Sequence, residues 1–294
     1  MTLHDRIKIY IALTRADKPI GSYLLLWPTL CALWIATQGQ PSALHVIVFS
    51  LGVFLTRSAG CVINDIADRN IDGKVKRTAN RPLALGLIST IEAVILFTTL
   101  MAIAFILVLT TTNAMTVYLS FAALLLAFSY PFMKRYTQLP QVVLGAAFGF
   151  GIPMAFSATT EQVPLIAWAL YFAKITWTVA YDTMYAMVDR DDDLKIGVKS
   201  TAILFGKNDN TINAALQLTT LALLIVVGFL ANLGIIYYLG LVLMSGLFGY
   251  QQYLTQNRDR DNCFKAFLNN HYAGLVLFIA VFLDYLPSYT RYLH

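Results

Sequence analysis

The chain has 294 residues, of which 58% are hydrophobic and only 13% are charged. Soluble domains carry roughly 25% charged residues, so this composition excludes a soluble enzyme and indicates a protein that crosses a membrane several times. Its three cysteines lack CxxC spacing, which argues against a disulfide framework or a thiolate metal site. No small-residue cleavage site follows a short apolar core near the N-terminus, so we expect no removable signal peptide. We expect a single domain over residues 1–294.

Nine apolar runs are long enough to cross a bilayer as helices, which takes about 20 residues each. We therefore predict an all-α membrane protein, a bundle of nine transmembrane helices around a central cavity open to the cytoplasmic face. The predicted spans are 20–37, 45–63, 89–110, 113–131, 141–159, 163–181, 211–232, 233–250 and 270–288.

Lys and Arg are unevenly divided between the two faces of this predicted bundle. With nine spans, 18 of the 21 fall in loops on one face, and only Arg291 falls on the other. Cytoplasmic loops carry an excess of Lys and Arg, so this face and the N-terminus are predicted to be cytoplasmic. The loops of that face are 1–19, 64–88, 132–140, 182–210 and 251–269.

The first chemically distinctive stretch directly follows the second predicted span. Asn64, Asp68 and Asp72 are four residues apart, so on a helix they form one polar stripe. Carboxylates one turn apart repel each other unless a cation lies between them, and hard oxygen ligands suit Mg²⁺. A basic cluster follows and supplies the positive charge that a phosphate group needs: Lys74, Lys76, Arg77 and Arg81.

A second stretch repeats this pattern after the sixth predicted span. Asp189 and Asp193 repeat the spacing of the first pair, and Tyr185 stands where Asn64 stands in the first stretch. Lys195 and Lys199 follow. Both stretches lie on the predicted cytoplasmic face, so we interpret them as two halves of one site. The alternative is that they are solvated loop charges.

Four further cations are candidates for binding an anion. Arg57 lies seven residues before Asn64, on the same predicted helix face, and we expect it to point into the cavity. For Lys174, in the sixth span, we favour snorkelling to the lipid headgroups. Lys134 and Arg135 end the fourth span on the predicted cytoplasmic face, where they could bind phosphate or carboxylate.

This set of residues suits a diphosphate with a long hydrocarbon tail. Mg²⁺ bridges carboxylates to diphosphate and makes it a better leaving group. If the tail is allylic, departure of diphosphate leaves a carbocation, which aromatic faces stabilise while water is excluded.

The motifs resemble the UbiA superfamily of intramembrane prenyltransferases, and within it the bacterial ubiquinone-pathway members that act on 4-hydroxybenzoate. The paired Asp-rich motifs carry the superfamily resemblance, Asn64-Asp65-x-x-Asp68-x-x-x-Asp72 with Asp189-x-x-x-Asp193. The narrower resemblance extends, with its motifs in order, from about residue 6 to 285. The narrower resemblance rests on Arg15-Ala-Asp-Lys-Pro-Ile-Gly21, Leu26-Trp-Pro-Thr-Leu30, Arg57-Ser-Ala-Gly-Cys61, Val75-Lys-Arg-Thr-Ala-Asn-Arg-Pro82, Tyr130-Pro-Phe-Met-Lys-Arg135, Leu139-Pro-Gln-Val-Val-Leu-Gly145 and Tyr181-Asp-Thr-Met-Tyr-Ala-Met-Val-Asp-Arg-Asp-Asp-Asp193.

The resemblance implies Mg²⁺-dependent transfer of a polyprenyl group to carbon 3 of 4-hydroxybenzoate, with release of diphosphate, in the bacterial inner membrane. The acceptor carboxylate would pair with Arg135 or, as a second choice, Arg57. The expected metal ligands are Asp68, Asp72, Asp189 and Asp193, and the expected diphosphate contacts are Asn64, Arg77, Arg81, Lys134, Tyr185 and Lys195.

Two alternatives remain at this point. A relative with another acceptor, such as a naphthoate or haem, would carry similar Asp-rich motifs. A transporter could also use paired acidic sites and intramembrane cations, although transporters usually bind near the midplane of the bilayer. Apart from the two substrates and the lipid bilayer we expect no nucleic acid and no obligate protein partner.

Overall fold

The structure, a computed structural model, describes residues 2–291, and these contain helices and no β-strand. The predicted all-helical class is confirmed. The α-helices are α1 (Leu3–Thr14), α2 (Ile20–Ala36), α3 (Ala43–Asp68), α4 (Thr90–Thr111), α5 (Ala114–Tyr136), α6 (Pro140–Gly149), α7 (Gly151–Thr160), α8 (Leu165–Ile196), α9 (Thr201–Phe205), α10 (Asp209–Leu230), α11 (Ile235–Thr255) and α12 (Arg260–Arg291), with short 3-10 helices η1 (Asp72–Lys74) and η2 (Gly206–Asn208).

Helices cover all nine ranges that the apolar runs predicted, with α6 and α7 sharing the fifth. Six helical stretches of the described chain are long and apolar enough to cross a membrane: α3, α4, α5, α6 with α7, α9 with α10, and α12. The chain is therefore a multi-pass membrane protein. α2 is a shorter apolar helix of 17 residues, and the long helices α8 and α11 are not among these six stretches.

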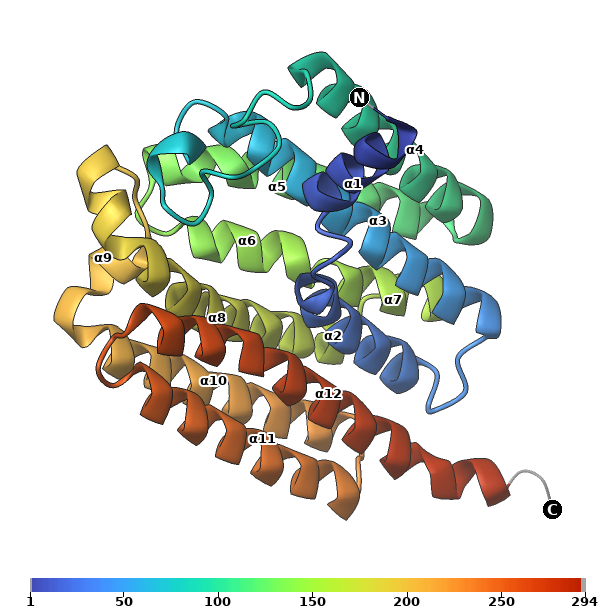
Figure 1. The fold of residues 1–294 in the computed structure, drawn as a ribbon. Helices are drawn as coiled ribbons and strands as arrows, with labels where there is room; N and C mark the ends of the chain where they lie inside the picture. Colours follow the sequence, from blue (N-terminus) through green and yellow to red (C-terminus); the bar gives the residue numbers. More distant parts are fainter. Residues whose placement is uncertain (1, 292–294) are drawn as a thin grey trace.

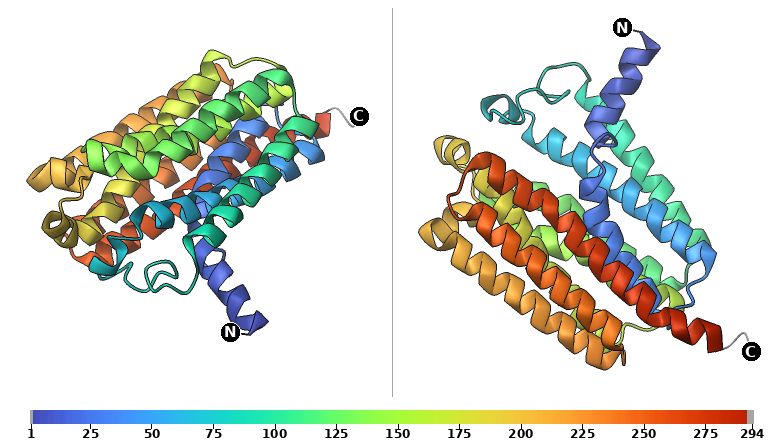
Figure 2. Two further views of the ribbon diagram at one scale, coloured as in Figure 1. Left: turned by 90° about the horizontal axis from the view of Figure 1, so that it is seen from above. Right: turned by 60° about the horizontal axis from the view of Figure 1, so that its bottom comes forward.

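The central helix of the bundle is α8. It packs against α6 on one side and against α10 and α12 on the other (Figure 1). α2 contacts α3, α7 and α12, and α3 pairs with α4. α1 projects away from this bundle (Figure 2). The loop after α3, the end of α8 and α9 all lie at the end of the bundle opposite to the C-terminal end of α12 (Figure 1).

The close packing of α6 against α8 depends on glycine. A Cβ at Gly145 would lie 3.2 Å from the backbone of Ile175 on α8. The absence of a side chain here therefore allows the two helices to approach closely. The helix is interrupted at Phe150, three residues before Pro153, because proline has no N–H to donate to the carbonyl four residues back.

Candidate active site

Both acidic stretches reach one cavity of about 140 Å³ at the loop end of the bundle. All four predicted metal-binding carboxylates line it: Asp68, Asp72, Asp189 and Asp193. Asn64, Arg77, Arg81, Lys134 and Tyr185 line it as well. The interpretation of two solvated, unrelated loops is therefore wrong, because segments more than 100 residues apart share one cavity wall.

The first stretch does not form one continuous helical stripe, as its spacing predicted. α3 carries Asn64 and ends at Asp68, where the chain turns with a hydrogen bond from the Ile71 N–H to the Asp68 carbonyl (2.8 Å). Asp72 follows in the short helix η1. Its carboxylate accepts from Arg81 at 3.0 Å, which holds Asp72 beside the cavity although it has left the helix.

The second stretch lies on a helix, whereas we predicted a loop over 182–210. α8 continues without a break for 32 residues to Ile196, so Tyr185, Asp189 and Asp193 share one face at four-residue spacing. The helix ends where Gly197 adopts a left-handed conformation (φ 73°), which glycine allows without steric cost.

Three acidic side chains are each paired with a cation, which for Asp68 and Asp189 comes from another segment of the chain. Lys134 of α5 donates to Asp68, and Arg81 donates to Asp72. Arg77 donates to Asp189 from Nε at 3.0 Å. Arg77 also donates to the Tyr185 hydroxyl and stacks 4.4 Å from the centre of its ring. Arg77 therefore joins the loop after α3 to α8 and connects the two halves of the site.

Burial and charge oppose each other at these loop residues. Burial raises the pKa of Asp72 above its usual value, although the adjacent Arg81 guanidinium acts in the opposite direction. Burial alone would lower the pKa of Arg77, but Tyr185 and Asp189 raise it above its ordinary value. Arg77 is therefore fully charged at neutral pH and suited to a phosphate oxygen.

The donor set fits a divalent cation that also binds a phosphate group. Among the described residues no group of three His, Cys, Asp or Glu side chains is arranged so that it could hold a metal ion by itself. Mg²⁺ usually takes only one or two carboxylates and completes its shell with water and substrate phosphates, so this arrangement is suitable. One buried oxygen of Asp68, Oδ1, has no hydrogen-bond partner, which leaves it available as a ligand.

Three predicted site residues lie outside the cavity lining. The Lys195 side chain is 76% exposed and faces Asp192 at 4.0 Å. Arg135 is exposed, and its guanidinium donates to the Ala67 carbonyl at 2.6 Å, near the end of α3. Arg57 lies deeper in the bundle, where Nη1 contacts the Cys61 sulfur at 2.5 Å and the buried Nε has no partner.

The sequence-based reasoning missed several cavity residues. Asp182, Tyr130 and Gln141 line the cavity, and Lys199 does so in place of Lys195. Asp182 had an available signal, since it precedes Asp189 by seven residues and so lies on the same face of α8. Gln141 had none, because its position depends on how α6 packs against α8.

Snorkelling of Lys174 to the membrane surface is contradicted by the structure. Its side chain is 2% exposed, and Nζ donates to the Tyr181 hydroxyl at 2.9 Å. The ammonium also lies 5.0 Å from the centre of the Trp177 ring. Lys174 is thus part of the buried polar contacts of α8.

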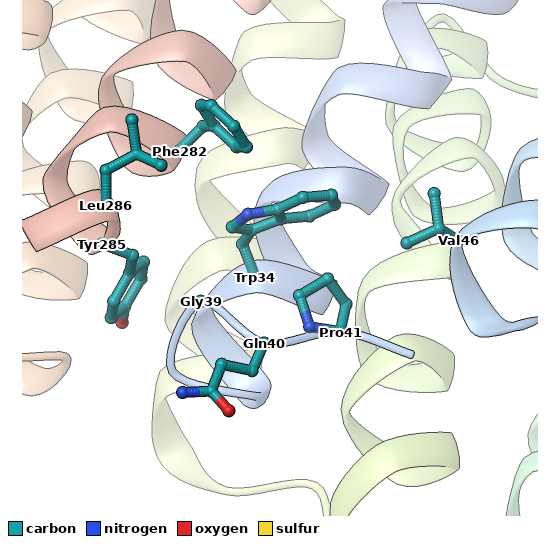
Figure 3. Close-up of a pocket in the computed structure, with 8 residues that line it drawn as sticks. All are labelled: Trp34, Gly39, Gln40, Pro41, Val46, Phe282, Tyr285 and Leu286. Carbon is teal, nitrogen blue, oxygen red and sulfur yellow. The ribbon is translucent and has the colours of Figure 1, made fainter. Parts of the chain in front are cut away.

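A larger cavity of about 500 Å³ lies at the opposite end of α2 and α12 (Figure 3). Trp34 and Phe282 face it from these two helices, and Pro41 and Val46 lie beyond Trp34 (Figure 3). Among the residues that the structure describes, those that line it carry no charge. The smaller, acidic cavity is therefore the better candidate for a site that binds a diphosphate and a cation.

Residues 25–281 match the sequence profile of the UbiA prenyltransferase family. The chain belongs to this family. The 4-hydroxybenzoate octaprenyltransferases of Yersinia enterocolitica and Pseudoalteromonas translucida are 61% and 62% identical to it, over 95% and 96% of this chain and 96% of each relative. The family resemblance carried by the Asp-rich motifs is confirmed.

Solved structures of UbiA homologues have the same fold as this family member. The apo structure of a homologue from Aeropyrum pernix K1 is 26% identical, with a TM-score of 0.79 over 89% of this chain and 98% of that one. A homologue from Archaeoglobus fulgidus bound to GPP and Mg²⁺ is 17% identical, with a TM-score of 0.69 over 93% and 99% of the two chains.

Proposed function

We propose that this chain transfers a polyprenyl group from polyprenyl diphosphate to carbon 3 of 4-hydroxybenzoate, releasing diphosphate, in ubiquinone biosynthesis. The meeting of two acidic stretches and their paired cations at one cavity is the observation that carries the proposal. The acceptor follows from relatives about 60% identical that are named 4-hydroxybenzoate octaprenyltransferases, and their name makes octaprenyl diphosphate the proposed donor.

The proposed cofactor is Mg²⁺, which when bound supplies the charge neutralisation that makes diphosphate a good leaving group. Homologues from Archaeoglobus fulgidus have been solved with Mg²⁺ and with Cd²⁺, which supports a divalent metal. Oxygen donors favour Mg²⁺ among the common metals. The proposed ligands are Asp68, Asp72, Asp189 and Asp193, with Asn64 assisting.

The cations now paired with these carboxylates are proposed to bind the diphosphate. Arg77, Arg81 and Lys134 line the same cavity as the two acidic groups, and each would exchange its carboxylate partner for a phosphate oxygen. Tyr185 lies beside Arg77. Lys195 points to solvent, so we propose Lys199 for the role we expected of it.

Arg57 is the proposed partner of the acceptor carboxylate, in preference to Arg135. The Arg135 side chain is exposed and bonded to a backbone carbonyl. Arg57 lies within the bundle, and a buried guanidinium nitrogen without an acceptor costs free energy that a bound carboxylate would recover. The phenol oxygen of the acceptor activates its ortho carbon, so the reaction needs no protein nucleophile.

We propose nine membrane crossings, with the site on the cytoplasmic side of the bacterial inner membrane. α2, α8 and α11 would cross together with the six strongly apolar helical stretches. The distribution of Lys and Arg supports the orientation, since the loop after α3 and the end of α8 hold many of the basic residues.

Membranes that contain this protein as their only prenyltransferase provide the test. With octaprenyl diphosphate fixed as donor, 4-hydroxybenzoate, a hydroxynaphthoate and haem are offered as acceptors. We expect a 3-octaprenyl product from 4-hydroxybenzoate alone, in intact membranes and in detergent. Product from another acceptor would reassign the enzyme within its family. Absence of product, with gradient-dependent transport of an ion, would favour the transporter alternative.

A further inference from the structure

We propose that Asp182 accepts the proton that leaves carbon 3 of the acceptor ring, an assignment that rests on the proposed reaction. Asp182 lines the same cavity as the predicted metal-binding carboxylates. It is not one of the proposed metal ligands.

The depth of Asp182 separates it from the metal site. It precedes Asp189 and Asp193 by seven and eleven residues on the unbroken helix α8. At about 1.5 Å per residue, it lies about 10 and 16 Å farther into the bundle. A cation that takes carboxylate oxygens at about 2.1 Å cannot also reach Asp182. Arg57 precedes Asn64 and Asp68 by the same intervals on α3. The carboxylate and the guanidinium therefore lie at a similar depth below the acidic mouth of the cavity.

The environment of Asp182 leaves it available as a base. In the described part of the chain no Lys or Arg forms an ion pair with it, in contrast to Asp68, Asp72 and Asp189. Its hydrogen-bond partner is the side chain of Gln141 on α6.

Gln141 is held in one orientation by the start of α9. Its side-chain oxygen accepts from the Thr201 N–H at 3.1 Å, which directs the amide nitrogen toward the carboxylate of Asp182. Three cations interact electrostatically with the carboxylate of Asp182. They are Arg57 on α3, Arg77 in the loop after α3, and Lys174 on α8. The Tyr130 hydroxyl, on α5, also interacts electrostatically with Asp182.

The step conserves atoms and electrons without a further reactant. As the bond between the allylic carbon and the diphosphate oxygen breaks, carbon 3 of the acceptor forms a new bond to that carbon. The ring then carries both hydrogen and the prenyl group at carbon 3. The C–H bond breaks, its electron pair restores aromaticity, and the proton moves to the Asp182 carboxylate. An acceptor held by Arg57 through its carboxylate would have its ring beside Asp182, at the depth both residues share.

The other carboxylates of the cavity suit this step less well. Asp68, Asp72 and Asp189 are each paired with a cation and are assigned to the metal. Asp193 lies one turn beyond Asp189, at the mouth of the cavity. Asp182 is thus the carboxylate nearest the proposed acceptor.

The test compares acceptor deuterated at both ortho carbons with ordinary 4-hydroxybenzoate. In the unmodified protein, proton loss is fast and we expect no isotope effect on kcat. In Asp182→Asn, kcat should fall by about 10²- to 10⁴-fold, the usual contribution of a general base, with both KM values unchanged. Proton loss should then limit the rate, so a primary isotope effect should appear. Asp182→Glu should recover part of kcat, and formate should recover part of it in Asp182→Ala.

The matched control is Asp191→Asn, on the same helix. Asp191 is exposed and paired with Arg260 outside the cavity, so this variant should behave as the unmodified protein does. Full activity in Asp182→Asn, a changed acceptor KM with kcat intact, or loss of kcat without an isotope effect and without formate rescue would overturn the assignment. If the unmodified protein prenylates no 4-hydroxybenzoate, the proposed function itself is wrong. This outcome is distinguishable from failure of the Asp182 assignment alone, in which the unmodified protein remains active.

Discussion

At the scale of single residues, three of the carboxylates that line the cavity are already neutralised by cations. Lys134, Arg81 and Arg77 each hold one of the acidic side chains. A metal ion alone would have to displace these cations, whereas a metal bound to diphosphate offers them phosphate oxygens as new partners. We therefore expect the metal and the diphosphate to bind more tightly together than separately.

Removal of one of the proposed metal-binding carboxylates should stop the reaction without unfolding the protein. Asp68→Asn and Asp189→Asn each remove one ligand charge, and we expect turnover to fall by about a hundredfold or more, since several kcal/mol of charge stabilisation is lost. EDTA should stop turnover reversibly. Prenylation assays and thermal unfolding in detergent measure both effects. Full activity of both variants, or in EDTA, would remove the metal from the mechanism.

The two candidate arginines for the acceptor carboxylate are distinguished by Michaelis constants. Lysine cannot reproduce the two parallel hydrogen bonds of a guanidinium to a carboxylate. Arg57→Lys should therefore raise the KM for 4-hydroxybenzoate by about ten- to a hundredfold, equivalent to a charge-assisted bond of about 1.5–3 kcal/mol, and leave the KM for the donor unchanged. Arg135→Lys is the comparison. If it raises the acceptor KM and Arg57→Lys does not, the acceptor role returns to Arg135.

At the scale of elements, the site joins a rigid helix to an irregular segment. α8 presents its acidic face from one continuous helix, whereas residues 69–88 contain only the short helix η1 between α3 and α4. Arg77 holds this segment to Asp189 of α8, and Arg81 holds it to Asp65 of α3. The segment is thus positioned by its contacts with the site more than by regular secondary structure.

Loss of Arg77 should loosen this segment locally. In Arg77→Ala we expect faster amide hydrogen exchange over residues 69–88, because the contacts with Asp189 and Tyr185 are removed, and no change within the core of α8. Arg69→Ala is the control, since Arg69 donates to the Ile66 carbonyl within one turn of its own chain. Mass spectrometry of peptides from both variants measures the exchange. Equal exchange in the two variants would contradict a role for Arg77 in holding the segment.

At the scale of the whole molecule, the fold places the chemistry at one end of a membrane bundle. The cavity lies at the end that carries the loop after α3 and α9, opposite to the C-terminal end of α12 (Figure 1). Residues 292–294, at which the predicted topology ends, lie outside the described residues.

The proposed nine crossings would put the two ends of the chain on opposite sides of the membrane. A reporter inserted in the 182–210 segment should be cytoplasmic, and one fused after residue 294 should be periplasmic. Alkaline phosphatase and fluorescent-protein fusions distinguish the two sides. A cytoplasmic C-terminus would mean that the number of crossings is even, and the first helices to reconsider would be α8 and α11, which are not among the six strongly apolar stretches.

Much of the site could be predicted from local sequence, because its members lie on helices of fixed geometry. Four-residue spacing places Tyr185, Asp189 and Asp193 on one face of α8 wherever that helix is placed. The same spacing failed at Asp72, because α3 ends at Asp68 and the chain turns there. Periodicity predicts a face only where the helix continues, and the sequence carried no strong signal for this end.

The sequence by itself determined the membrane class, the helical ranges and the two acidic groups, since hydropathy and spacing are local properties. Only the tertiary structure decided which cation meets which carboxylate and which charges reach the cavity. Lys195 and Lys199 look equivalent in the sequence, yet one faces solvent and the other the site, because Gly197 ends α8 between them. Packing likewise decides that the Arg135 side chain is exposed and that Arg57 lies within the bundle. Such choices depend on contacts between segments far apart in the chain, which no local pattern encodes.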